Sequence, residues 1–210
     1  HGSRGDQLFT RPDIRKHWFP EFRETGAGIL CPNLRGNAWM SPAAAADMHD
    51  LICFLRADFG MRQALFCSGS MGGTSNLIYG VLYPNDVNGI VARGAATDLA
   101  SYHAWCRTRP RPIAREIAVA IESAYGGKPE SLPEIFAHHS TQKNAARLIM
   151  PVALSHGAAD ETIPGSQSRE LAQILAGKPD FFYEEIPGGG HDAPLWEKQG
   201  FQQVLRQMLK

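Results

Sequence analysis

The chain has 210 residues, a length that allows one globular domain with a sizeable hydrophobic core. Its 21 basic and 21 acidic residues balance, so no overall field favours nucleic acid or an anionic membrane, and no apolar stretch approaches the ~20 residues of a membrane span. The four cysteines are scattered without metal-ligand spacing, and neither a metal nor another cofactor is expected.

The cysteines and the first residues bear on the cellular compartment. No apolar signal-peptide core follows His1, and scattered cysteines suit a reducing environment, so the sequence favours a cytoplasmic location. A targeting segment lost from ahead of residue 1 is the alternative.

Strand and helix patterns alternate along most of the chain. This alternation predicts an α/β protein with a mostly parallel sheet and helices on both faces. In chain order, the predicted elements of the first half are a helix at 12–24, a strand at 28–32, a helix from Ser41 to Gly60, a strand at 63–67, a helix that Pro84 ends, and a strand at 89–93.

Residues 99–147 interrupt this alternation. They carry one amphipathic helix with Ile113, Ile117 and Ile121 on one face, and a cluster of arginines among prolines: Arg107, Arg109, Arg111 and Arg115. We expect a small helical cap at about 99–147. The elements predicted after it are a strand at 150–154, a helix near 167–176, a strand at 181–186, and a closing helix that carries Phe201, Val204, Leu205 and Met208.

The segment Ser68-Gly69-Ser70-Met71-Gly72-Gly73 lies between a predicted strand and a predicted helix. A serine with small residues two positions before and after it suits a nucleophile elbow, because larger side chains would collide in so tight a turn. The following helix would direct free N–H groups and its positive dipole end at an oxyanion beside Ser70. The alternative is a phosphate-binding glycine turn, but the Lys-Ser/Thr pair of a P-loop is missing.

A serine hydroxyl becomes a good nucleophile when a histidine takes its proton and a carboxylate orients that histidine. In strand-to-helix hydrolases the chain order is serine, acid, histidine, and this chain offers Ser70, Asp160 and His191. Each follows a predicted strand, so all three would lie at the carboxyl edge of the sheet. Order and position together predict a Ser-His-Asp triad.

Other residues compete for these roles. Asp98 also ends a strand and could serve as the acid, although capping of the next helix is favoured. Asp192 adjoins His191 too closely to orient its ring, so we expect it to face solvent. His156 is expected to support the Asp160 loop.

The motifs resemble the α/β-hydrolase superfamily. The resemblance rests on the elbow, on His156-Gly157-x-x-Asp160-x-x-x-Pro164 and on Gly190-His191. The passages 97–103 (Thr-Asp-Leu-Ala-Ser-Tyr-His) and 124–127 (Ala-Tyr-Gly-Gly) are similar to the prolyl-oligopeptidase-like and carboxylesterase-like serine hydrolases. The resemblance covers nearly the whole chain. It implies one catalytic domain over 1–210, which we expect to be part of a longer polypeptide.

The family also implies an oxyanion hole. There the N–H after the nucleophile, here that of Met71, acts with an N–H from a His-Gly loop that follows an earlier strand. The start of the chain, His1-Gly2-Ser3-Arg4-Gly5, resembles that loop, which would place Gly2 and Ser3 in the oxyanion hole. The alternative is that His1-Gly2-Ser3 remains from an affinity tag.

The N-terminal strands of the family are absent from this chain. One of them would lie in mid-sheet, between the strands expected at 28–32 and 63–67. Its loss would leave buried backbone groups unpaired, each at a cost on the order of 1–3 kcal/mol. We therefore expect another segment or chain to supply the missing strand, and direct pairing of 28–32 with 63–67 would contradict this.

The implied activity is a serine hydrolase that works through an acyl-enzyme. Carboxylic esters of small molecules are the favoured substrates, because dedicated peptidases of this group usually carry a large extra domain. A peptidase or aminopeptidase would use the same residues, and a non-catalytic ligand-binding module on the same fold is a third possibility.

Two further groups of side chains have open roles. The arginines of 107–115 could attract an acidic substrate, although a solvated cap surface is favoured. Four large apolar side chains could line an acyl pocket or belong to the ordinary core: Trp39, Met40, Trp105 and Trp196.

Overall fold

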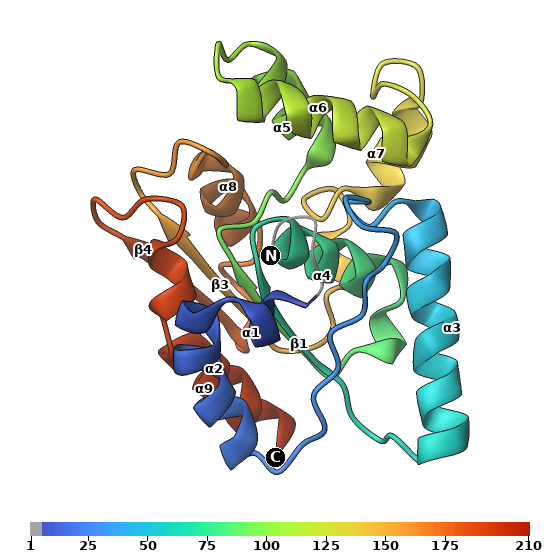
Figure 1. The fold of residues 1–210 in the computed structure, drawn as a ribbon, viewed down its shortest axis with the longest axis vertical. Coiled ribbons are helices and arrows are strands. Elements are labelled where there is room, and N and C mark those ends of the chain that lie inside the picture. Colours follow the sequence, from blue (N-terminus) through green and yellow to red (C-terminus); the bar gives the residue numbers. More distant parts are fainter. Residues whose placement is uncertain (1–5) are drawn as a thin grey trace.

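A computed structural model, which describes residues 6–210, contains one sheet of four parallel strands (Figure 1). The strands lie side by side in sequence order: β1 (Leu65–Gly69), β2 (Gly89–Arg93), β3 (Val152–Gly157) and β4 (Phe181–Ile186). Parallel neighbours need crossover connections, which helices supply here. The predicted α/β class with a parallel sheet is confirmed.

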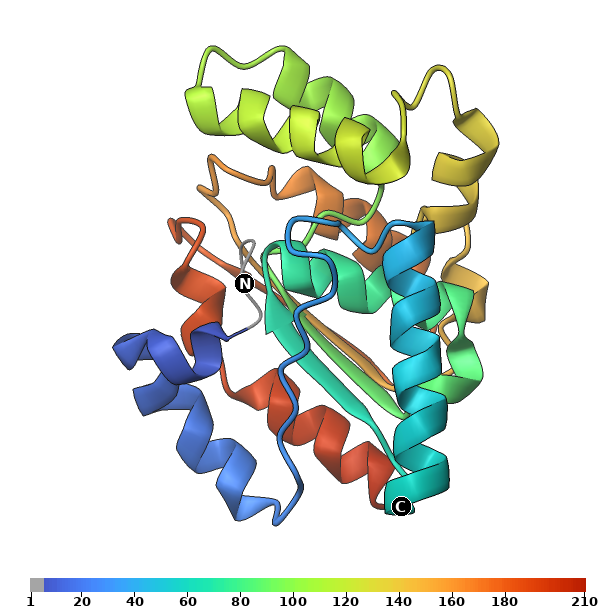
Figure 2. The same cartoon turned by 45° about the vertical axis from the view of Figure 1, so that its right-hand side comes forward.

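Helices cover both faces of the sheet, with α3 and α4 on one side and α2 and α9 on the other (Figures 1 and 2). The helices outside the cap are α1 (Gln7–Thr10), α2 (Pro12–Glu24), α3 (Pro42–Phe59), α4 (Met71–Leu82), α8 (Ser166–Ile174) and α9 (Gln199–Met208). Three short 3₁₀ turns are η1 (Pro84–Asp86), η2 (Ala145–Arg147) and η3 (Ala193–Trp196).

The apolar runs of the central strands are explained by this two-sided burial. Ile90 of β2 belongs to a large core that also contains Leu77 of α4. The next residue, Val91, packs instead with Phe201 and Val204 of α9. Successive side chains of a strand point to opposite faces, so every residue of β2 must be apolar or specifically paired.

Proline and glycine set helix boundaries where the sequence places them. Pro42 opens α3, and Gly60 ends it in the left-handed region at φ +61°. Pro112 opens α6, and Gly126 ends it at φ +79°.

The predicted cap consists of three helices, α5 (Leu99–Arg107), α6 (Pro112–Tyr125) and α7 (Pro133–His139). They lie together beyond the carboxyl ends of the strands (Figures 1 and 2). Several hydrogen bonds attach the cap to the body. Among them, Tyr102 Oη donates to the carbonyl of Thr162 at 3.0 Å, and Gln167 Nε2 donates to Ser101 Oγ at 2.8 Å. The cap is therefore anchored beside the loop that follows β3.

The prediction of a strand at 28–32 is wrong. Residues 27–34 have no regular secondary structure and pass beside a cavity of about 470 Å³ that lies along β1. Gly28 and Pro32 flank only three apolar residues, and proline cannot donate to a sheet ladder, so this run is too short to pair. β1 and β3 also begin two residues later than predicted.

β1 is an edge strand, because within residues 6–210 it pairs only with β2. Ser70 N, just after β1, donates to Arg93 O of β2 at 2.7 Å. Backbone groups of successive strand residues point to opposite edges, so those of Leu65, Cys67 and Gly69 point away from β2. The prediction that another segment or chain supplies a strand is not tested by this arrangement, and this edge is where such a strand would pair.

Hydrogen exchange measured by NMR tests the edge. In the 210-residue chain we expect the amides of Leu65 and Cys67 to exchange faster than those of Phe66 and Ser68, which point toward β2. A strand supplied from elsewhere would slow exchange at Leu65 and Cys67. Equal protection of all four amides in the isolated chain would contradict a free edge.

Candidate functional site

Ser70 occupies the turn between β1 and α4. Its backbone has φ 57° and ψ −128°, a conformation that residues other than glycine rarely adopt and that costs on the order of 1–3 kcal/mol. Both sides of the turn are fixed, since Ser70 N donates to Arg93 O at 2.7 Å and Ser70 O accepts from Thr74 N at 3.0 Å. The strain is therefore held by the strand and the helix that it connects.

Small residues around Ser70 allow α4 to pass close to the sheet. A Cβ atom on Gly73 would lie 3.2 Å from both Arg93 N and Ala95 Cβ. On the strand side, Ser68 Oγ accepts a hydrogen bond from Asn76 Nδ2 at 2.7 Å. The space that a nucleophile elbow requires is present.

Ser70, His191 and Asp160 form a continuous hydrogen-bonded path. His191 Nε2 lies 2.9 Å from Ser70 Oγ, and His191 Nδ1 lies 2.7 Å from Asp160 Oδ2. The Asp160 side chain is fully buried and that of His191 is 18% exposed. The structure thus brings together the three residues that the sequence singles out as a triad.

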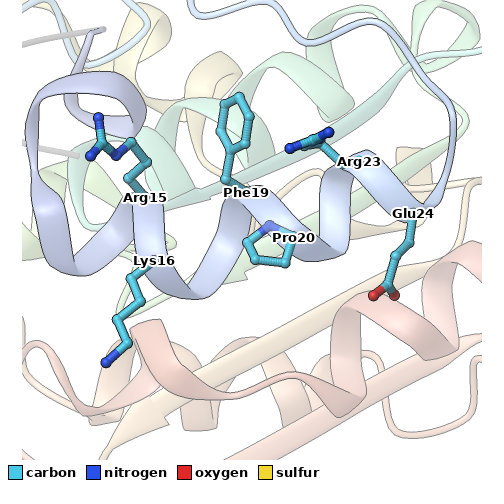
Figure 3. Close-up of a pocket in the computed structure, with 6 residues that line it drawn as sticks. All are labelled: Arg15, Lys16, Phe19, Pro20, Arg23 and Glu24. Carbon is cyan, nitrogen blue, oxygen red and sulfur yellow. The ribbon is translucent and has the colours of Figure 1, made fainter.

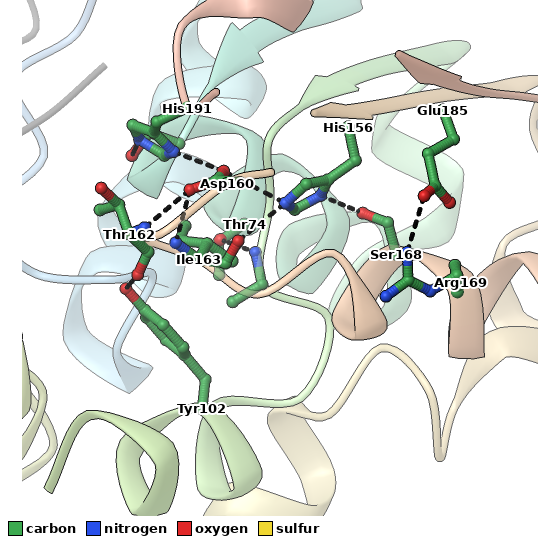
Figure 4. A network of polar contacts seen from close by, with 12 residues as sticks. Thr74, Tyr102, His156, Asp160, Thr162, Ile163, Ser168, Arg169, Glu185 and His191 are labelled. Atoms are coloured by element: carbon green, nitrogen blue, oxygen red, sulfur yellow. Dashed lines mark hydrogen bonds and ion pairs between the residues drawn. The ribbon is translucent and has the colours of Figure 1, made fainter. Parts of the chain in front are cut away.

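Asp160 is surrounded by hydrogen-bond donors (Figure 4). Its Oδ1 accepts from the backbone N–H groups of Thr162 and Ile163 at 2.8 and 3.0 Å, and His156 Nε2 lies 3.2 Å from Oδ2. Burial alone would raise the pKa of this carboxyl, but the hydrogen bonds from His156 and His191 outweigh burial and hold the pKa well below its usual range. The carboxylate is therefore charged at neutral pH.

His156 supports the loop that carries Asp160. Its buried ring bonds Ser168 Oγ through Nδ1 at 2.6 Å and the Ile163 carbonyl through Nε2 at 2.9 Å (Figure 4). These contacts tie the loop to α8, as the sequence led us to expect.

The His191 loop lies directly against the end of β3. A Cβ atom on Gly157 would come within 2.3 Å of the carbonyl oxygens of Gly189 and Gly190. Ala159 N also donates to Gly189 O at 2.9 Å. Sequence reasoning did not assign this positioning role to Gly157, although its place after His156 in the quoted motif was a usable signal.

Of the three residues predicted to form the oxyanion hole, the structure describes Met71. Met71 is the first residue of α4, so its N–H has no acceptor within the helix and lies at the positive end of the helix dipole. Gly2 and Ser3 lie outside the described residues.

The competing acids have other partners. Asp98 accepts from Ser101 N at 2.8 Å, and so caps α5, and it also accepts from Ser140 Oγ at 2.5 Å. The Asp192 side chain is 52% exposed and lies 3.6 Å from Arg11. Neither replaces Asp160 beside His191.

The four apolar side chains with open roles separate in the structure. Trp39 and Met40 are buried and line the cavity beside β1, which also reaches Met71. Trp105 lies in the cap with the Arg109 guanidinium 4.6 Å from its ring centre. Trp196 is 38% exposed.

The cap arginines are mainly exposed. Arg111 forms an ion pair with Glu161, the neighbour of Asp160, and both side chains are open to solvent. An ion pair this exposed contributes little to stability. It does place one cap arginine next to the loop that carries the acid.

A second hollow, of about 650 Å³, lies on the outer face of α2 (Figure 3). It shares no residue with the Ser70 path, so it is not the candidate site. Its lining comes from a single helix: Arg15, Lys16, Phe19, Pro20, Arg23 and Glu24.

Two searches of residues 6–210 bear on other function classes. Within this range no three His, Cys, Asp or Glu side chains are grouped to hold a metal ion. None of the helices in the same range has the length and apolar character needed to cross a membrane. The cytoplasmic location stays a prediction.

No protein-family model and no curated protein matches the chain. Solved structures do match, at low identity. They include a bifunctional GH43-CE protein of Bacteroides eggerthii (TM-score 0.69, 18% identity, 92% of this chain and 28% of that one). A truncated carbohydrate esterase from gut microbiota also matches, with a TM-score of 0.62 and 19% identity over 86% of this chain and 74% of that one. A Mycobacterium tuberculosis puromycin-hydrolyzing peptidase matches with a TM-score of 0.59 and 20% identity over 82% of this chain and 24% of that one.

The chain spans 22% of the length of a putative dipeptidyl aminopeptidase IV from Bacteroides ovatus, another matching structure, and 24% of that of the puromycin-hydrolyzing peptidase. This chain has parallel strands, helices on both faces of the sheet and a strand-to-helix turn at Ser70. Its fold matches the three structures over 82%, 86% and 92% of its length. The predicted α/β-hydrolase fold is therefore confirmed.

Proposed function

We propose that this chain is a serine hydrolase that cleaves carboxylic esters of small molecules through an acyl-enzyme. The observation that carries the proposal is the path from Ser70 Oγ through His191 to the buried, charged Asp160, with both contacts below 3 Å. Ser70 also sits at the N-terminus of α4, where negative charge is favoured.

In the first step, Ser70 Oγ attacks the ester carbonyl carbon while His191 Nε2 takes the hydroxyl proton. Asp160 accepts the hydrogen bond from His191 Nδ1 and stabilises the imidazolium that forms. The carbonyl oxygen becomes an oxyanion, for which the Met71 N–H is the donor available in the described residues.

In the second step, His191 returns its proton to the leaving alcohol and the acyl group stays on Ser70. A water molecule then attacks the acyl carbon as His191 takes the proton of that water. Collapse of the second tetrahedral intermediate releases the acid and restores the Ser70 hydroxyl. No group outside the chain and the two reactants is needed.

Two of the matching structures bear on the choice between esters and amides. The carbohydrate esterase shares the fold over 86% of this chain with a TM-score of 0.62. The puromycin-hydrolyzing peptidase shares it over 82% with a TM-score of 0.59, so a peptidase or aminopeptidase is the second candidate. Both candidates require the same three residues.

Ser70→Ala tests the mechanism. We expect the variant to lose kcat/KM on chromogenic esters by about 10⁴-fold or more, because the hydroxyl that lies 2.9 Å from His191 Nε2 is removed. A fluorophosphonate should label the wild type at Ser70 and leave the variant unlabelled, as read by mass spectrometry. Ser131→Ala, in an exposed loop, is the control and should keep full activity.

Three outcomes separate the candidates. Ester turnover that survives in Ser70→Ala would refute the mechanism. Faster turnover of aminoacyl amides than of esters with the same acyl group would favour the peptidase. Absence of fluorophosphonate labelling on the folded wild type would indicate a non-catalytic binding module.

Asp160→Asn should lower stability in a pH-dependent way. The pKa of Asp160 is lower in the folded chain than in the unfolded chain, so the charged carboxylate stabilises the fold above the unfolded pKa of about 4. This contribution is lost as pH falls below that value. We expect Asp160→Asn to reduce the free energy of unfolding by on the order of 2–3 kcal/mol at pH 7, and by progressively less below pH 4.

Urea unfolding between pH 3 and 7 measures this difference, with Asp58→Asn at an exposed position of α3 as the control. A deficit that is the same at pH 3 and pH 7 would show that the Asp160 charge does not stabilise the fold.

Gly157→Ala should displace the His191 loop, since its Cβ atom would overlap two backbone carbonyl oxygens. We expect kcat/KM to fall by about 10²-fold or more because His191 moves away from Ser70. Gly177→Ala is the matched control, because a Cβ atom there meets nothing within 4 Å. Normal activity in a folded Gly157→Ala variant, checked by circular dichroism, would contradict the positioning role.

A further inference from the structure

A second nucleophile, base and acid lie in line at α3 and η1, and they share no residue with the Ser70 path. Cys53 Sγ lies 3.8 Å from Nε2 of His49, one helical turn earlier on α3. His49 Nδ1 lies 2.7 Å from Oδ2 of Asp86, in η1. The imidazole therefore stands between a thiol and a carboxylate.

Asp86 is a fixed, charged partner for this ring. Its side chain is 6% exposed and accepts from Tyr79 Oη at 2.7 Å and from Arg56 Nη1 at 2.8 Å. Burial alone would raise the pKa of Asp86, but the hydrogen bonds from Tyr79, His49 and Arg56 outweigh burial and lower it. Three side chains, those of His49, Arg56 and Tyr79, therefore fix the position of the Asp86 carboxylate.

The His49 ring is held in one orientation. It stacks on Tyr83 with ring centres 4.5 Å apart and planes 15° from parallel. In the neutral tautomer that donates Nδ1–H to the Asp86 carboxylate, the lone pair of Nε2 faces the Cys53 thiol. The charged and titratable groups that contact His49 or its partner Asp86 include Arg56 on α3, Tyr79 on α4 and Tyr83 just before η1.

Cys53 differs from the other three cysteines. It is exposed, whereas Cys106 is buried and Cys31 and Cys67 are partly covered. Burial raises the pKa of Cys31 and of Cys67, and that of Cys106 to about 11, which favours the protonated, less nucleophilic thiol. The chain therefore combines one accessible thiol with a positioned base and contains three less reactive thiols for comparison.

We propose that Cys53 is a site of mixed-disulfide formation with low-molecular-weight disulfides. His49 Nε2 takes the thiol proton, and the Cys53 thiolate attacks one sulfur of the small disulfide. A new S–S bond forms to Cys53 as the old one breaks, and the departing thiolate takes the proton from His49. One thiol and one disulfide are consumed and one of each is produced, so the exchange requires no further oxidant.

Oxidised glutathione is the probe. The wild-type protein is incubated with it between pH 5.5 and 9, and modification of each cysteine is followed by peptide mass spectrometry. We expect Cys53 to react about tenfold or more faster than Cys31, with the largest advantage near neutral pH, where a base partner matters most. This comparison is internal to one protein and depends on no variant.

Variants identify the base. His49→Gln should bring the Cys53 rate close to that of Cys31 and move its pH profile upward, while His138→Gln, which removes an exposed cap imidazole, should change neither. Ser70→Ala should react at the wild-type rate, which separates this site from the proposed hydrolase. Equal rates at Cys53 and Cys31 in the wild type, or an unchanged rate in folded His49→Gln, would overturn the proposal.

Discussion

The buried charge of Asp160 is the constraint around which the candidate site is built. A carboxylate removed from water must be given donors, because an uncompensated buried charge costs several kcal/mol. Here two backbone N–H groups, His156 and His191 supply them. The two histidines also position other parts of the site. His156 ties the Asp160 loop to α8, and the hydrogen bond to Asp160 holds His191, which lies on the loop after β4, beside Ser70. The same contacts that stabilise the charge thus assemble the path.

Close backbone approach is the second requirement. The Asp160 and His191 loops can meet only because Gly157 has no side chain between them, and α4 can bring Ser70 to β2 only because Gly73 has none. Such positions add no chemistry, yet they decide the distances on which the chemistry depends. The close neighbours are backbone carbonyl oxygens at Gly157, and Arg93 N and Ala95 Cβ at Gly73. An unusual φ angle is not the reason, since neither glycine lies in the left-handed region.

Local signals made most of the fold predictable. Period-2 and period-3.6 patterns, with proline and glycine at helix ends, located all four strands of the sheet and predicted one strand that does not form. The order of Ser70, Asp160 and His191 located the path. The strand expected at 28–32 failed because pairing depends on a neighbour that a short apolar run does not specify. The positioning role of Gly157 was missed for a similar reason: the carbonyl oxygens that exclude a side chain come from a loop about 30 residues away.

The two histidine-centred paths share a geometry but not an environment, and the environment separates their chemistry. In each, Nδ1 faces a buried carboxylate and Nε2 faces a nucleophile. Ser70 stands at the N-terminus of α4, where unbonded N–H groups can stabilise the oxyanion of acyl transfer. Cys53 lies about three turns into α3, where backbone N–H groups are bonded within the helix. Disulfide exchange forms no oxyanion, so it is the reaction that a thiol in this position can carry out without such support.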